Sequence, residues 1–487
     1  MFETDRSLTL TIAFHPDTSR IGEQSVLRHV IEGEAITLNR NQPSFAQRGD
    51  MPMPLEDSHI SRSPILIRLE EEELVIDPTQ TTTEVVLQGE WLREETKTPL
   101  WKVNKGLTLK LADRVMLCIH FSQNTKGRHP SRGLVGQGDA MDEIREMIGD
   151  LAAEDAPALL IGESGVGKRR VARAVHDASS RGGRAFETID LEAFPPSSVM
   201  HQLIGDEGHL ARAEGGTLYI EGLSEVEDAV QALFLKLAQK GEYADIRGDT
   251  RAADVRLLVG SKREPEHAVA EGHLRSEYTA LFSSSLQLPP LRHRIEDIAP
   301  LFVHFLKGAL RERGQIVLLQ DGGPGRPLWL PPDFIGRLLR HQWPGNAAQL
   351  KAVAEAVANT CGQGYTVRVT KEVERFLDDA QTFDHGLGLG MPATEKVAPS
   401  DVTDQDLLGA LKAYRWNATA TANHLGVSVR AVQDLMDGSP MFKKAERLSE
   451  QATSSVMTQF GGDLTLAAEQ LQVSIRSLKR HLAKSAS

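Results

Sequence analysis

The first 121 residues carry short runs in which apolar and polar side chains alternate. Alternation with a period of two is typical of strands that bury one face, and polar turns separate the runs. The pattern predicts an N-terminal β-sandwich over residues 1–121, followed by a linker over residues 122–133 that is nearly free of apolar side chains. The predicted strands are Leu8–Phe14, Ile65–Leu69, Leu74–Asp77, Thr83–Leu87, Leu107–Leu111 and Val115–Phe121.

From Leu134 to about Leu377 the pattern changes, and buried apolar strands alternate with helical segments. This alternation is typical of a parallel sheet covered by helices, which predicts a central α/β module. The clearest buried strands are Pro157–Gly162, Thr217–Ile220 and Val255–Val259.

A second linker, residues 381–404, precedes a C-terminal part that contains an internal repeat. Asn417–Val432 aligns with Asp463–Leu478, and the offset pairs Leu425 with Leu471 and Arg430 with Arg476. The repeat predicts two copies of one small all-α unit, over residues 405–440 and 441–487. The fold class is therefore multidomain: a β-sandwich, a central α/β module and C-terminal helical repeats.

Composition limits the classes of function. The chain has 487 residues and a net charge of −12, so nucleic-acid contact must be local rather than spread over the surface. Its two cysteines lie far apart in sequence and predict no disulfide framework. No apolar run approaches the ~18 residues of a membrane span, and the start MFETDRS does not resemble a signal peptide. We expect a cytoplasmic protein that has no membrane partner.

A glycine-rich loop lies between the strand Pro157–Gly162 and a helical pattern over Arg169–Ala178. In a phosphate-binding loop, glycines let backbone N–H groups face the phosphates, and a lysine reaches the β and γ oxygens. We predict that this loop binds ATP, although an arginine stands where many such loops have the Ser or Thr that ligates Mg²⁺. The predicted ATP-binding residues are Gly162, Glu163, Ser164, Gly165, Val166, Gly167, Lys168 and Arg169.

Hydrolysis of ATP needs a carboxylate that holds Mg²⁺ and a group that orients the attacking water. Both normally follow the next strand of the sheet, which here is Gly215–Ile220 and is followed by Glu221 and Gly222. Glu221 is the candidate Mg²⁺ ligand, whereas Gly222 has no side chain to act as a base. We therefore expect ATP binding, with Mg²⁺ as a possible companion, and impaired or absent hydrolysis.

Residues 134 to about 360 resemble the AAA+ module of bacterial enhancer-binding proteins, the activators that work with the sigma-54 form of RNA polymerase. The resemblance implies a nucleotide-binding subdomain over residues 134–310, a helical lid over residues 311–380, and assembly with further copies or with related regulators. The matching strings are GESGVGK at 162–168, AEGGTLYI at 213–220, LPPLRHRIEDI at 288–298 and WPGNAAQL at 343–350.

The chain departs from this family pattern at several positions. The GAFTGA loop, through which the family contacts the sigma factor, is missing before the strand at 217. Gly222 and Lys262 stand where the family has its second acid and a sensor asparagine, and Ala348 replaces an arginine of the lid. Asp190 replaces a gating asparagine, and at most one trans-acting arginine is kept, near Arg275. The departures predict a module that no longer works as an ATP-driven motor, and a doubtful contact with sigma-54 polymerase.

The N-terminal sandwich resembles a forkhead-associated domain, a fold that binds phosphothreonine. The strand near Ile36–Leu38 and the segment 57–62 lie where that family places its phosphate-binding arginines and serine. The resemblance implies that Arg40, Ser61 and Arg62 bind a phosphothreonine protein.

Each C-terminal repeat resembles the Fis-type helix-turn-helix that ends enhancer-binding proteins. The second copy carries the locally basic recognition helix, which predicts contact with double-stranded DNA. The first copy has acidic residues there, Asp434 and Asp437, and is interpreted as a packing or dimerisation unit. The predicted DNA-binding residues are Ser474, Arg476, Ser477, Lys479 and Arg480.

Together these features predict a DNA-binding transcription regulator with an ATP-binding central module and a phosphoprotein sensor. Two other functions stay open. One is an active AAA+ ATPase that drives promoter opening, with Glu221 and the nearby Glu225 supplying the acids. The other is an interaction scaffold that does not bind DNA.

Overall fold

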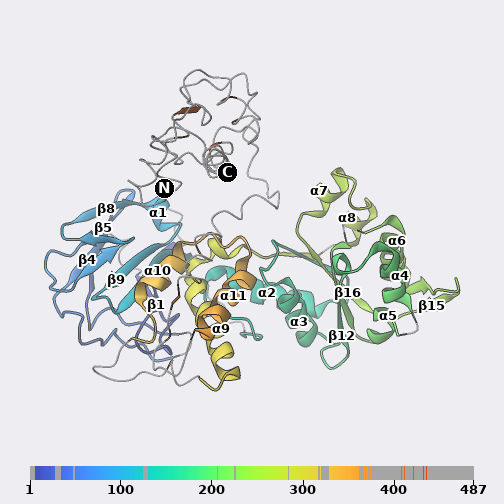
Figure 1. Ribbon diagram of the computed structural model, residues 1–487, viewed down its shortest axis with the longest axis horizontal. Helices are drawn as coiled ribbons and strands as arrows, with labels where there is room; N and C mark the ends of the chain where they lie inside the picture. Colours follow the sequence, from blue (N-terminus) through green and yellow to red (C-terminus); the bar gives the residue numbers. More distant parts are fainter. Residues whose placement is uncertain are drawn as a thin grey trace, which may run out of the picture. The chain divides into compact units, whose positions relative to one another are not determined.

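The computed structural model divides into two compact units, residues 1–384 and 385–487 (Figure 1). In the described part, no helix combines the length and the apolar character that a membrane crossing requires. The predicted linker at 381–404, the second helical repeat with all five predicted DNA-binding residues, and Glu225 lie outside the described residues. The structure describes residues 6–27, 34–47, 50–123, 130–205, 207–223, 226–282, 284–315 and 328–360, and single residues between 319 and 435.

Two antiparallel sheets form the N-terminal part. The first has the order β2-β1-β10-β9-β6-β7 and the second has the order β3-β4-β5-β8. All six strands expected from the alternating pattern are confirmed, as β1, β4, β5, β6, β9 and β10. The strands are β1 (Arg6–Phe14), β2 (Gln24–Leu27), β3 (Ile36–Leu38), β4 (Ile65–Glu70), β5 (Glu73–Asp77), β6 (Val85–Leu87), β7 (Glu90–Leu92), β8 (Thr96–Pro99), β9 (Leu107–Leu111) and β10 (Val115–Gln123), with helix α1 (Leu100–Val103) before β9.

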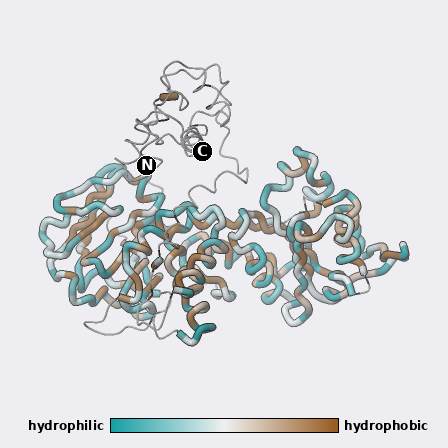
Figure 2. Tube along the Cα trace, viewed as in Figure 1, coloured by the Kyte–Doolittle hydropathy of each residue, from teal (hydrophilic) through white to brown (hydrophobic). Residues whose placement is uncertain are grey.

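The alternation places leucine and isoleucine between the two sheets. Leu8, Leu10 and Ile12 of β1 are fully buried and pack in one apolar cluster with residues of β4, β5, β9 and β10. Figure 2 shows hydrophobic segments running through this sandwich. Its core accounts for the strand pattern, because a shift of one residue would turn each apolar side chain outward.

His120 of β10 is buried on the other face of the first sheet. Its Nε2 lies 2.8 Å from Thr11 Oγ1, and burial lowers the pKa of the imidazole from 6.5 to about 4. As the pH falls from 6.5 toward 4, the unfolded chain takes up this proton before the folded chain does. The contribution of the neutral His120 to the free energy of unfolding is therefore fully present above pH 6.5. It decreases as the pH falls below 6.5, by about 3 kcal/mol at pH 4.

We expect a His120→Gln variant to lack this part of the pH dependence. Urea unfolding of the sandwich at neutral pH and near pH 4 measures it, because the wild-type protein should lose more stability than the variant. Equal losses in the two proteins would show that His120 is not the responsible group.

The central module is built on a parallel sheet with the order β12-β13-β16-β11-β17. The three strands expected from the sequence are confirmed as β11, β13 and β16. Helices α2 and α3 cover one face, and α4, α5 and α6 cover the other, each group with its own apolar cluster (Figure 1). The elements are α2 (Asp139–Ala153), β11 (Ala158–Ile161), α3 (Lys168–Ala178), β12 (Phe186–Asp190), α4 (Pro196–Ile204), α5 (His209–Arg212), β13 (Thr217–Glu221), α6 (Asp228–Lys240), β14 (Glu242–Ala244), β15 (Thr250–Ala252), β16 (Arg256–Ser261), α7 (Pro265–Ala270), α8 (Glu277–Leu281) and β17 (Ser284–Gln287).

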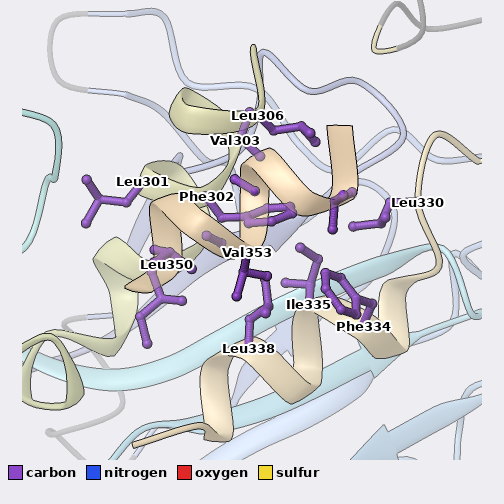
Figure 3. Packing of buried hydrophobic residues seen from close by; sticks show 14 of the residues in the cluster. Leu301, Phe302, Val303, Leu306, Leu330, Phe334, Ile335, Leu338, Leu350 and Val353 are labelled. Carbon is purple, nitrogen blue, oxygen red and sulfur yellow. The ribbon is translucent and has the colours of Figure 1, made fainter. Parts of the chain in front are cut away.

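Three helices follow the sheet and share one core: α9 (Ile298–Glu312), α10 (Pro332–Arg340) and α11 (Asn346–Asn359). Figure 3 shows Phe302 of α9, Leu338 of α10 and Val353 of α11 among the side chains packed between them. We call α9, α10 and α11 the lid helices. The predicted boundary at residue 310 falls inside α9, because the apolar face of that helix belongs to the same cluster as α10 and α11.

The apolar cluster of the lid helices continues into the N-terminal sandwich. Phe14 of β1 stacks on Trp329, with ring centroids 4.9 Å apart, and Trp329 Nε1 donates to the His15 carbonyl at 3.0 Å. At its edge, Lys110 of β9 pairs with Asp333 of α10 at 2.6 Å. The sandwich and the lid helices therefore share one hydrophobic core.

Candidate functional site

The loop between β11 and α3 has the backbone of a phosphate-binding loop. Gly165 and Gly167 have φ values of +76° and +110°, which side chains of L-residues rarely adopt. A Cβ on Gly165 would also collide with the carbonyl oxygen of Gly345 in the lid. Because α3 begins at Lys168, the unpaired N–H groups of its first turn and its positive dipole end lie at this loop.

Lys168 is the buried cation of the loop, with 3% of its surface exposed. Its Nζ donates to the carbonyl oxygens of Gly162 at 2.9 Å and Glu163 at 3.2 Å, and lies 3.2 Å from Glu221 Oε1. The structure thus brings the predicted loop residues and the predicted acid of β13 together in one site.

A cavity of about 530 Å³ runs along the loop. Four apolar side chains line part of it: Leu134, Val135, Met141 and Ile144. Its charged lining is mostly basic, with Lys168, Arg169, Arg170, Lys262, Arg294 and Lys351 against Asp190, Glu192 and Glu221. This volume is within the usual range for small-molecule sites, and the lining suits a ligand with an apolar ring and an anionic tail.

Three acids line the cavity, two of them at the carboxyl ends of β12 and β13, and each already has a partner. Asp190 and Glu221 are opposite each other in the parallel register. Asp190 accepts the backbone N–H of Glu192 at 3.1 Å and so caps the short 3-10 turn Leu191–Ala193. Glu192 binds Lys262 Nζ through both oxygens, at 2.8 and 3.0 Å, and Glu221 pairs with Lys168.

Gly222, at the position after Glu221, is closed to any side chain. Its φ is +82°, and a Cβ there would lie 2.8 Å from Glu192 Cγ. A carboxylate at this position would therefore require both a change of backbone and displacement of Glu192. The missing acid seen in the sequence is matched by a backbone that has no room for one.

The segment before β13 packs against the sheet. The chain passes from α4 through α5 to β13, and Leu210 and Ala213 are buried in the same cluster as α4 and α6. This is the place where the family resemblance would put the GAFTGA loop.

A hydrogen-bond network, which sequence reasoning did not identify, joins the phosphate-binding loop to the lid. Arg292 donates to both oxygens of Glu163, at 2.9 and 2.6 Å, and Asn346 Nδ2 donates to Glu163 Oε2 at 3.0 Å. Burial alone would raise the pKa of Glu163, but these hydrogen bonds outweigh it and lower that pKa. The strings LPPLRHRIEDI and WPGNAAQL contain Arg292 and Asn346, so their match to one family was the available signal.

The predicted phosphothreonine-binding residues lie on adjacent loops of the sandwich. Arg40 donates its backbone N–H to the Ser61 carbonyl at 3.1 Å, and its guanidinium binds the carbonyls of Ile60, at 2.9 Å, and Ser58. Ser61 Oγ accepts from Ser63 N at 3.0 Å, and the Arg62 side chain is exposed. Arg40 therefore ties the loop, while Arg62 is free to reach a ligand.

The residues present do not fit the Mg²⁺ site of a P-loop enzyme. Mg²⁺ takes oxygen ligands, and such enzymes supply a Ser or Thr hydroxyl and a carboxylate. Here Arg169, which has no acceptor atom, stands at the hydroxyl position, and Glu221 is the counter-ion of Lys168. Within the described ranges, no three His, Cys, Asp or Glu side chains form a metal-binding group.

Comparison with known proteins gives one family match. Residues 134–285 match the family described as Sigma-54 interaction domain. The matched segment contains the phosphate-binding loop, β13 and β16, and it ends within β17.

Individual relatives cover part of the chain. DNA-binding transcriptional regulator NtrC of Bradyrhizobium sp. (strain RP501 Parasponia) is 33% identical over 48% of this chain and 49% of that protein. The C4-dicarboxylate transport transcriptional regulatory protein DctD of Pseudomonas aeruginosa is 32% identical over 55% of this chain and 58% of its own length. The solved structure of NtrX from Brucella abortus in complex with ATP aligns with a TM-score of 0.47 and 23% identity, over 73% of this chain and 69% of that one. The chain thus spans about half of the length of these curated relatives.

Proposed function

We propose that this protein is a DNA-binding transcription regulator of the sigma-54 activator type whose central module binds ATP without turning it over. The family match over residues 134–285 supports the class, and the relatives NtrC and DctD are named as transcriptional regulators. The phosphate-binding loop, the buried Lys168 and the mostly basic cavity support ATP binding.

The arrangement at the carboxyl edge of the sheet carries the proposal that ATP is not hydrolysed. Attack on the γ-phosphate needs a group that orients water, and such a group contributes ~10² to 10⁴-fold to the rate. Glu221, Glu192 and Asp190 are engaged by Lys168, Lys262 and the backbone. The position after Glu221 has no room for a further acid. The site holds a triphosphate but does not prepare water to attack it.

The protein then acts by binding DNA and by assembling with related regulators. Ser474, Arg476, Ser477, Lys479 and Arg480 are the proposed DNA contacts. Without the GAFTGA loop, whose place is taken by the packed α5 segment, we propose that the chain does not drive the polymerase. The sandwich serves as the sensor: Ser61 and Arg62 bind a phosphothreonine, and Arg40 positions their loop through the Ile60 and Ser58 carbonyls, in a domain that shares its core with the lid helices.

ATP binding and ATP turnover, measured on the same purified full-length protein, test the proposal. We expect the wild-type protein to bind ATP and the Lys168→Ala variant to lose binding by at least about tenfold, because a buried charge-assisted contact is removed. Phosphate release should be equal in the two proteins. Lys240→Ala, at the exposed end of α6, is the matched control and should bind like wild type.

Two outcomes would contradict the proposal. Phosphate release that depends on Lys168 would identify a working ATPase. Equal ATP affinity in the wild-type and Lys168→Ala proteins would show that the loop is not the binding site.

A further inference from the structure

We propose that the cavity binds the nucleoside triphosphate as its metal-free anion, with side chains of the protein in place of Mg²⁺. This rests on the proposed ATP binding and specifies the form of the ligand. The proposal follows from the finding that the residues of the site do not supply the oxygen ligands that Mg²⁺ requires. Three features of the cavity support it.

Arg169 is the first feature. It is the second residue of α3, it is exposed, and it lines the cavity. In the part of the chain that the structure describes, its guanidinium has no ion-pair partner, whereas Arg173 of the same helix is held by Asp177 at 2.8 Å. A free guanidinium at the metal position repels Mg²⁺ and offers its N–H donors to phosphate oxygens.

The balance of charge is the second feature. Six basic side chains line the cavity against three acidic ones; Glu221 and Glu192 neutralise Lys168 and Lys262, and Lys351 pairs with Glu355 outside the lining. The remaining excess of positive charge suits a triphosphate that carries its full charge. A metal-bound triphosphate has already lost part of that charge, so it would gain less from these cations.

Tyr219 is the third feature. The residue is 1% exposed and lines the cavity, and its buried hydroxyl makes no hydrogen bond of regular geometry with the described residues. Burial, then the charge of the neighbouring Glu221 carboxylate and its capacity to accept from the phenol, raises the pKa of this phenol, so it keeps its proton and is a donor. Because the neighbouring Glu221 is already paired with Lys168, a phosphate oxygen can accept the hydrogen bond of this buried donor, whereas a metal cation cannot.

ATP titrations by calorimetry on the full chain, in excess EDTA and in excess MgCl₂, test this inference. We expect binding in EDTA to be at least as tight as in MgCl₂. Arg169→Thr, which restores a hydroxyl at the metal position, should weaken binding in EDTA by about tenfold and make Mg²⁺ favourable. Arg173→Ser, the control on the same helix but outside the cavity lining, should match wild type in both solutions.

The outcomes separate this inference from the proposal beneath it. Binding that requires MgCl₂, or an Arg169→Thr protein that binds in EDTA as tightly as wild type, would overturn the metal-free site and leave ATP binding intact. Failure to bind ATP in either solution would overturn both.

Discussion

Replacing Asn346 by alanine should make it easier for the lid helices to separate from the phosphate-binding loop. The free energy required for this opening should fall by about 4 kcal/mol. The Asn346 side chain is fully buried and makes three hydrogen bonds. Its Oδ1 accepts from Leu291 N at 2.8 Å, and its Nδ2 donates to Glu163 Oε2 and to the Ser164 carbonyl, both at 3.0 Å. Alanine removes all three hydrogen bonds, although Glu163 keeps its bonds from Arg292, and it also strains a backbone whose φ is +50°.

Asn346→Gly separates the two causes. Glycine loses the same hydrogen bonds but tolerates the left-handed backbone, so it should be less destabilising than alanine by about 1 kcal/mol. Hydrogen exchange of the amides of α11 and the loop, compared among the three proteins, reports the opening directly. If both variants protect these amides as well as wild type, Asn346 does not hold the lid.

Replacing Trp329 by alanine should destabilise the junction of the sandwich and the lid helices by about 4 kcal/mol. The indole is 4% exposed, stacks on Phe14 and donates to the His15 carbonyl at 3.0 Å. Its loss leaves a cavity between the sandwich and the lid, and an unpaired carbonyl in the same place. Hydrogen exchange of the α10 and β1 amides, measured at increasing urea concentrations, reports the loss of stability.

Trp91→Ala is the matched control for this substitution. Trp91 lies on β7 of the same sandwich, but 58% of its surface is exposed, and the Arg93 guanidinium lies over its ring at 4.5 Å from the centroid. We expect a change below about 1 kcal/mol. Similar losses in the two variants would show that the sandwich and the lid helices do not share a core.

Local patterns in the chain were enough to predict nine of the strands and the phosphate-binding loop. The alternation in Leu8–Phe14 identified β1, and the apolar run before Gly162 identified β11, because the burial of each strand is written in its own residues. The glycines at 165 and 167 predicted a phosphate-binding loop, and the structure gives both of them the left-handed backbone that few other residues adopt. Glu221 and Gly222 were placed correctly for the same reason, as the residues that end a recognisable strand.

The partners of these residues lie far away in the chain and left no local pattern. Glu163 meets Arg292 and Asn346, and Lys262 meets Glu192, only once β11, β16 and the lid have packed. The sequence identified Asp190 and Glu221 but not Glu192, and whether an acid of the cavity is free or already neutralised depends on distances of about 3 Å, which the packing of the core sets. Periodicity thus reveals what a segment buries, while pairing across the sheet edge is a property of the assembled module.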